Sequence, residues 1–244
     1  MKRGMSTKPS IEILTAESWP FPVQEVRSRS RQIYLRLRQM IILGELVPLE
    51  KLKIAELAEE LGANSSAVRE ALSRLTAEHL VEARDQQGFR VAPISIAELD
   101  DLTRTRCDIE TLALKRSIER GSKAWAQALK LAHREISNYS GDPQAPEGMA
   151  LHAQFHKAVL AGCESPALLR IWQALYEMAE RYRAIAVRQA GPSRPVADEH
   201  DRIAKAALDR DVDAAATLLT NHIERTAALV RDAILKASAD GGNC

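Results

Sequence analysis

The chain has 244 residues, enough for two small domains or one large domain with a sizeable core. Its 34 basic and 33 acidic residues give a net charge of +1, so the overall charge predicts neither a nucleic-acid partner nor a membrane surface. Three cysteines without a CxxC pair support neither a disulfide scaffold nor a thiolate zinc site.

The N-terminal stretch has no apolar core of the kind found in a signal peptide, and no apolar run approaches the ~20 residues that span a bilayer. We therefore expect a soluble, cytoplasmic protein without a membrane partner. Aromatic residues make up only 4% of the chain, which is otherwise rich in Ala, Leu, Glu and Arg. This composition favours an all-helical fold.

Residues 1–26 carry Ser, Pro and Thr without a sustained period and are expected to form a loose tail. A first helix is expected over 27–43, with Ile33, Leu37, Met40 and Ile41 on one face and Gly44 at its end.

Two shorter helices and a hairpin follow. The apolar pattern predicts a second helix around 54–61 that Gly62 closes, and a third over 65–78. Extended pieces at 80–83 and 88–91 flank a polar turn. Helices in this order, followed by a hairpin, predict a winged helix-turn-helix over residues 27–93.

The second half shows only helical periodicity. Ser95 and Glu98 form a capping-box pattern, so a helix is expected over 96–120, ending at Gly121. Further helices are expected at 122–139, 147–161, 166–188, 196–209 and 212–237. The chain is thus predicted to be dominated by α-helix, with an antiparallel helical bundle over 95–238.

The polar face of the third helix carries short hydrogen-bonding side chains and arginines: Ser65, Ser66, Arg69, Ser73 and Arg74. A recognition helix needs this arrangement, and Arg69 can pair with a guanine edge or clamp a phosphate. Backbone contacts to DNA are expected from five further basic residues: Arg36, Arg38, Lys51, Lys53 and the wing residue Arg90. The alternative is an ordinary solvated face with a few positive charges.

Four of the six histidines fall on the apolar stripes of three expected helices: His152, His156, His200 and His222. His152 and His156 are four residues apart and project from one face, and the stripe of His222 is expected to continue to Leu229. Helices bury imidazoles together only if something binds their lone pairs. The pattern predicts a shared metal or anion site; the alternative is four separate core histidines bonded to backbone carbonyls.

The stretch LRQMIILGELVPLEKLKIAELAEELGANSSAVREALSRLTAEHLVEARDQQGFRVAP closely resembles the winged-helix domain of GntR-family transcription factors. The later helices, with Phe155-His156 and Glu199-His200, resemble the ligand-binding (FCD) domain of the FadR-type branch. The resemblance covers about residues 30–237. It implies a dimeric regulator that binds a double-stranded DNA operator and responds to a small organic or sugar acid.

Three departures from the family pattern concern the DNA-reading half. The family usually has Ser-Arg-Thr-Pro where this chain has Asn64-Ser65-Ser66-Ala67, so Arg69 is expected to carry more of the base reading. Two glycines of the family are replaced by Leu49 and His79. Because His tolerates a left-handed backbone better than most residues, the fold is expected to survive.

The resemblance also implies a metal site. Many FCD domains hold a divalent metal with one Asp and three His, in the order Asp-x3-His, Glu-His and a final His 22 positions later. This chain keeps the spacing with His152, His156, His200 and His222, but its first ligand is His instead of Asp. Imidazoles suit Zn²⁺, Ni²⁺ and Cu²⁺, whereas Mg²⁺ and Ca²⁺ prefer oxygen. Zn²⁺ or Ni²⁺ is expected, with His152 as the least certain ligand.

An arginine at the place of Arg106 commonly binds an effector carboxylate in the family, and we expect the same here. Alternatively, Arg106 pairs with Glu110 or another surface acid. Tyr182, Arg183 and Arg188 are further candidates for the wall of the same cavity.

Two other functions stay open at this point. Histidine ligands on a bundle can activate water, as in a metal-dependent enzyme, but no acid–base motif such as HExxH accompanies them and Glu199 is the only adjacent carboxylate. The third possibility is a direct metal sensor, in which metal alone changes DNA affinity. Our expectation is a regulator that is not an enzyme.

Overall fold

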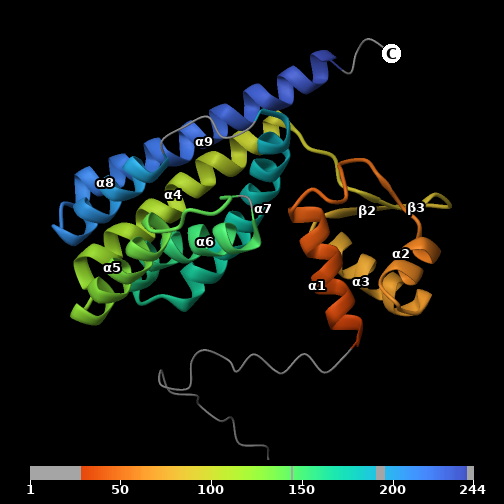
Figure 1. Ribbon diagram of the computed structural model, residues 1–244, viewed down its shortest axis with the longest axis horizontal. Helices are drawn as coiled ribbons and strands as arrows, with labels where there is room; N and C mark the ends of the chain where they lie inside the picture. Colours follow the sequence, from red (N-terminus) through yellow and green to blue (C-terminus); the bar gives the residue numbers. More distant parts are fainter. Residues whose placement is uncertain (1–28, 144, 191–195, 241–244) are drawn as a thin grey trace, which may run out of the picture.

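The computed structural model describes residues 29–143, 145–190 and 196–240. The expected N-terminal tail and the first two residues of the first expected helix lie outside them. Within these ranges two groups of elements pack around separate cores, with the winged helix-turn-helix on the right of Figure 1 and the helical bundle on the left.

The winged helix-turn-helix consists of α1 (Arg29–Ile42), β1 (Lys51–Leu52), α2 (Ile54–Glu60), α3 (Ser65–Ala77), β2 (Val81–Arg84) and β3 (Gly88–Val91). The α1 residues expected to face inward, Ile33, Leu37, Met40 and Ile41, are all buried. β3 is the middle strand of an antiparallel sheet in the order β1-β3-β2, pairing with Val81–Arg84 on one side and with Lys51–Leu52 on the other. The sequence pattern gave no sign of β1, because two residues are too few to show an alternation.

Five described residues other than glycine adopt a left-handed backbone, and two of them are Leu49, with φ of 67°, and His79, with φ of 58°. These two are the positions where the resemblance implied missing glycines. An L side chain in this conformation costs about 1–2 kcal/mol. At His79 the turn nevertheless forms, since the Leu80 N–H donates to the Leu75 carbonyl and α3 ends as expected. The fold therefore accommodates both replacements.

The bundle consists of α4 (Ile96–Arg120), α5 (Lys123–Ser137), α6 (Pro146–Leu160), the short 3-10 helix η2 (Ala161–Cys163), α7 (Pro166–Ala190), α8 (Val196–Leu208) and α9 (Val212–Asp240). α4 and α9 lie side by side along the bundle, and α7 is the helix nearest the winged unit (Figure 1). At the start of α4, the Ser95 hydroxyl accepts from the Glu98 N–H, as the capping pattern predicted. A core around Leu114, Phe155 and Trp172 fills the space between the helices.

One expected apolar stripe follows a different path. Leu229 on α9 is 41% exposed, whereas its neighbour Val230 is 3% exposed and packs with Leu99 and Tyr182. The prediction that Leu229 faces inward is therefore wrong. A straight α-helix has 3.6 residues per turn, so the face that contacts a partner helix moves gradually around a long helix. Over the 29 residues of α9 this drift is enough to move the buried position from Leu229 to Val230.

α7 also joins the two units. Arg38 on α1 donates from Nε to Glu78 at 3.0 Å and from Nη2 to Glu177 on α7. Buried Arg181 donates to the carbonyl oxygens of Ala92 and Pro93 in the connection that follows the wing. One helix thus contacts the winged unit, its connection to the bundle, and the bundle interior.

Candidate functional site

The four histidines of the sequence pattern meet at one point inside the bundle. His152 and His156 come from α6, His200 from α8 and His222 from α9. One ligand atom of each lies within 4.8 Å of the others. The ring centroids of His152 and His156 are 4.6 Å apart, and those of His200 and His222 are 5.0 Å apart. The alternative of four separate core histidines does not describe this arrangement.

Burial favours the neutral form of the two α6 histidines. His156 is 1% exposed, His200 2% and His222 5%, while His152 is partly exposed. Burial, reinforced by the neighbouring histidines, lowers the pKa of His152 and of His156 well below the ordinary value of 6.5. A metal ion binds only neutral imidazole, so His152 and His156 have the required protonation state at neutral pH.

Two residues outside the cluster orient its rings. The Glu199 carboxylate accepts from Nδ1 of His222 at 2.8 Å, which fixes the tautomer whose lone pair is on Nε2. The Tyr176 hydroxyl and Nδ1 of His152 share a hydrogen bond of 2.7 Å. Partners of this kind hold metal-binding histidines in place in many proteins. The sequence showed Glu199 as the carboxylate next to His200. Nothing in the sequence around Tyr176 indicated that its hydroxyl would bond to His152.

The donor set fits a transition metal. Nε2 of buried His156 has no hydrogen-bond partner among the described residues, a costly state that a metal ion would relieve. Tetrahedral nitrogen ligands at 2.0–2.1 Å from Zn²⁺ lie about 3.4 Å from one another. The widest separation, 4.8 Å, must therefore shorten by about 1.4 Å, which side-chain rotations can supply.

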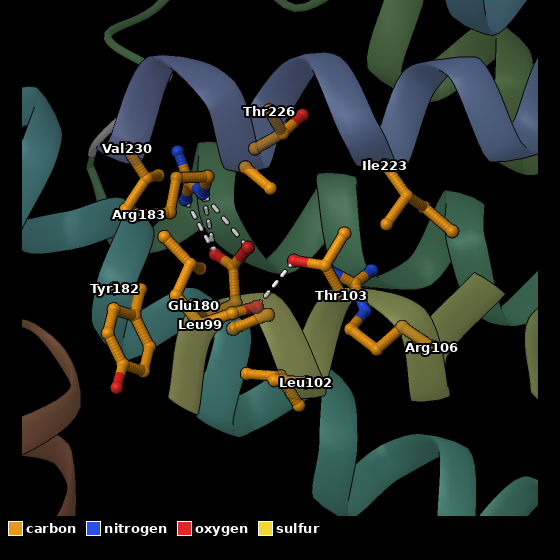
Figure 2. Close-up of a pocket in the computed structure, with 12 residues that line it drawn as sticks. Leu99, Leu102, Thr103, Arg106, Glu180, Tyr182, Arg183, Ile223, Thr226 and Val230 are labelled. Atoms are coloured by element: carbon orange, nitrogen blue, oxygen red, sulfur yellow. Dashed lines mark hydrogen bonds and ion pairs between the residues drawn. The ribbon is translucent and has the colours of Figure 1, made fainter. Parts of the chain in front are cut away.

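A small cavity beside the cluster contains Arg106, Tyr182 and Arg183, three of the candidates named from the sequence (Figure 2). The side chain of Arg188 lies outside the described residues. Arg106 lines the cavity and donates to Glu110 at 2.7 Å, which is the pairing that the alternative expected, while its binding of an effector carboxylate stays a prediction. Glu110 is not a surface acid, however: it is fully buried, and burial raises its pKa despite the opposing effect of Arg106.

α3 presents the expected polar face. Asn64 caps the helix by accepting from the Ala67 N–H at 2.8 Å. The polar side chains that follow are all exposed: Ser65, Ser66, Arg69, Ser73 and Arg74. Arg74 differs from the rest, because its guanidinium lies 4.6 Å from the centre of the Tyr34 ring on α1. Arg69 is therefore the α3 arginine whose surroundings best suit base reading.

The residues expected to contact the DNA backbone lie on α1, next to α2 and on the wing. Arg36 pairs with Glu45 at 2.9 Å and Lys53 with Glu56 at 2.7 Å, both on the surface. Arg90 is partly buried on β3, where it pairs in register with Lys51 and Glu82. Arg36 and Lys53 are exposed, and their phosphate contacts, like that of Arg90, stay predictions. Arg38 is instead held by Glu78 and Glu177.

Among the described residues, no helix is both long and apolar enough to cross a membrane. Residues 29–91 match the family model "Bacterial regulatory proteins, gntR family", and residues 101–225 match the model of the FCD domain.

The chain is similar to two bacterial regulators over most of their length. It is 32% identical to the uncharacterized HTH-type transcriptional regulator BphR of Paraburkholderia xenovorans, over 88% of this chain and 91% of that protein. It is 33% identical to the HTH-type transcriptional repressor GlaR of Escherichia coli, over 82% and 95%. The structure of E. coli McbR/YncC has the same fold, with a TM-score of 0.71 and 20% identity over 84% of this chain and 98% of that one. These relatives are transcriptional regulators and not enzymes, which argues against the alternative of a metal-dependent enzyme.

Proposed function

This chain belongs to the gntR family of bacterial regulatory proteins and carries an FCD domain, so it is a DNA-binding transcriptional regulator. We propose that its two units divide the work as follows. The winged helix-turn-helix, residues 27–93, reads an operator. The bundle, residues 95–238, binds a small organic or sugar acid next to a metal ion. Ligand binding there changes the population of the DNA-competent conformation.

The histidine cluster carries the metal part of the proposal. His156, His200 and His222 hold one Zn²⁺ or Ni²⁺, and His152 takes the fourth position that a carboxylate usually has in the family. Glu199 and Tyr176 keep the rings oriented. With four neutral ligands the bound ion keeps its full double charge, which favours an anionic group of the effector.

Arg69 carries the DNA part of the proposal, assisted by Ser65, Ser66 and Ser73 on the same exposed face. Arg36, Lys53, Arg74 and Arg90 contribute phosphate contacts. One winged helix covers few base pairs, so we propose a homodimer that binds a twofold operator. A monomeric mass in light scattering at micromolar concentration, with and without DNA, would exclude the dimer.

The proposed function is tested with untagged protein on DNA fragments selected from a random pool. Organic and sugar acids are first screened for a rise in melting temperature with and without Zn²⁺ and Ni²⁺, because ligands of the folded state raise it by linkage. Acids that bind are then added to the protein–DNA complex. Release or tightening of DNA by an acid supports the proposal, whereas a response to metal alone identifies a direct metal sensor.

A further inference from the structure

Both arginines of the cavity in Figure 2 are already neutralised by carboxylates of the protein. Arg106 pairs with Glu110. Arg183 donates from Nε to both oxygens of Glu180, at 2.9 and 3.0 Å, and from Nη2 to one of them at 2.6 Å. The side chains of Arg183 and Glu180 are only 16% and 10% exposed.

The Glu180–Arg183 pair does not tie the bundle together. Both residues lie on α7, three positions apart, so their bond links no helix to another. A buried ion pair must also offset the loss of hydration of two charges, and apolar residues of similar size are often at least as stabilising. Packing therefore gives no reason for a carboxylate at this place.

The Glu180 carboxylate itself occupies the cavity. In Figure 2 it lies between Arg183 and Thr103, with Arg106 on the far side of Thr103. The free space that remains is about 20 Å³, enough for about one water molecule. Apolar residues surround it: Leu99, Leu102, Ile223 and Val230. An organic acid can enter only if this side chain moves.

The cavity also lies next to the histidine cluster. Ile223, which lines the cavity, directly follows His222 on α9. A carboxylate bound to Arg183 therefore lies beside the proposed metal site.

We propose that the guanidinium of Arg183 is a subsite for a ligand carboxylate, and that Glu180 occupies this subsite until a ligand displaces it. This proposal rests on the proposed function. The negative charge of Glu180 is the feature that keeps the site closed. The ligand class is an organic carboxylate whose remaining atoms contact the apolar wall. Because Glu180 and Glu177 are one turn apart on α7, displacement begins on the helix that also contacts Arg38 of the winged unit.

The test is chemical rescue of Glu180→Ala. This substitution removes a methylene and a carboxylate, which acetate replaces atom for atom. Metal is stripped with a chelator so that acetate cannot bind through the histidine cluster. Melting temperature is measured in acetate, in its neutral isostere acetamide, and in sodium chloride of equal ionic strength. With a Kd of about 25 mM, 100 mM acetate raises the melting temperature of the variant by about 2–4 °C.

Two variants control the assay. Glu177→Ala, also on α7, removes a carboxylate that pairs with Arg38 outside this cavity, and it should show no specific acetate response. Glu180→Ala combined with Arg183→Met removes the subsite itself and should lose the response. The wild-type protein should be unaffected by acetate, since Glu180 fills the space.

If Glu180→Ala is recovered only from acetate buffer, acetate-dependent recovery relative to acetamide is the same positive result. An equal effect of acetate and acetamide, or a response that survives Arg183→Met, overturns the proposal. So does the lack of any acetate effect on either stability or recovery. Because the assay uses metal-free protein and no DNA, these outcomes are independent of whether the metal site and the operator are as proposed.

Discussion

Replacing His200 by alanine tests the metal site most directly. His200 is 2% exposed and is the only described cluster residue that α8 supplies. Its loss leaves nitrogen donors from α6 and α9 alone, so stoichiometric metal should disappear. If Zn²⁺ binds the wild type with a Kd of about 1 µM, 100 µM free Zn²⁺ stabilises it by about 2.7 kcal/mol. For a chain of this size that raises the melting temperature by about 5–11 °C.

The assay compares the zinc-induced shift within each variant, because the deleted imidazole also leaves a cavity that destabilises the metal-free protein. His133→Ala is the matched control: His133 is 27% exposed, pairs with Asp201 and lies outside the cluster. It should keep one ion per chain and the full shift. His152→Asp, which restores the carboxylate of the family, should also keep metal. An unchanged zinc shift in His200→Ala, or no metal in the untagged wild type, would refute the metal site.

Three further predictions concern DNA, pH and the backbone. Arg69→Ala should weaken specific DNA binding by about 1–3 kcal/mol if it reads a base, and unchanged operator affinity in a fluorescence titration would exclude that role. Because burial lowers the pKa of His152 and His156, the unfolded chain binds more protons near pH 6.5. The melting temperature of metal-free protein should therefore fall as the pH drops below about 6.5, and fall less steeply when both are Asn. Leu49→Gly should raise the free energy of unfolding in urea by about 0.5–1 kcal/mol, since relief of strain at φ 67° exceeds the added chain entropy; a loss of stability would contradict this.

The sequence alone determined the helices, the wing hairpin and the four metal-ligand candidates, but not the short strand β1. A buried helical stripe needs only the 3.6-residue period, so the inward residues of α1 and the cap at Ser95 could be predicted from local order. The same period placed His152 and His156 on one face. Because helices of a bundle turn their stripes toward a shared interior, His200 and His222 could be expected there too.

Only the tertiary structure decided what surrounds those residues. The sequence gives Glu110 and Glu180 as ordinary helix acids, and their burial follows from the packing of other helices around them. Likewise, Tyr176 meets His152 and Arg74 meets Tyr34 across distances of 24 and 40 positions. Such contacts depend on the relative placement of whole helices. A local pattern fixes which face of a helix is apolar, but the partner that covers that face is set by the packing of the chain as a whole.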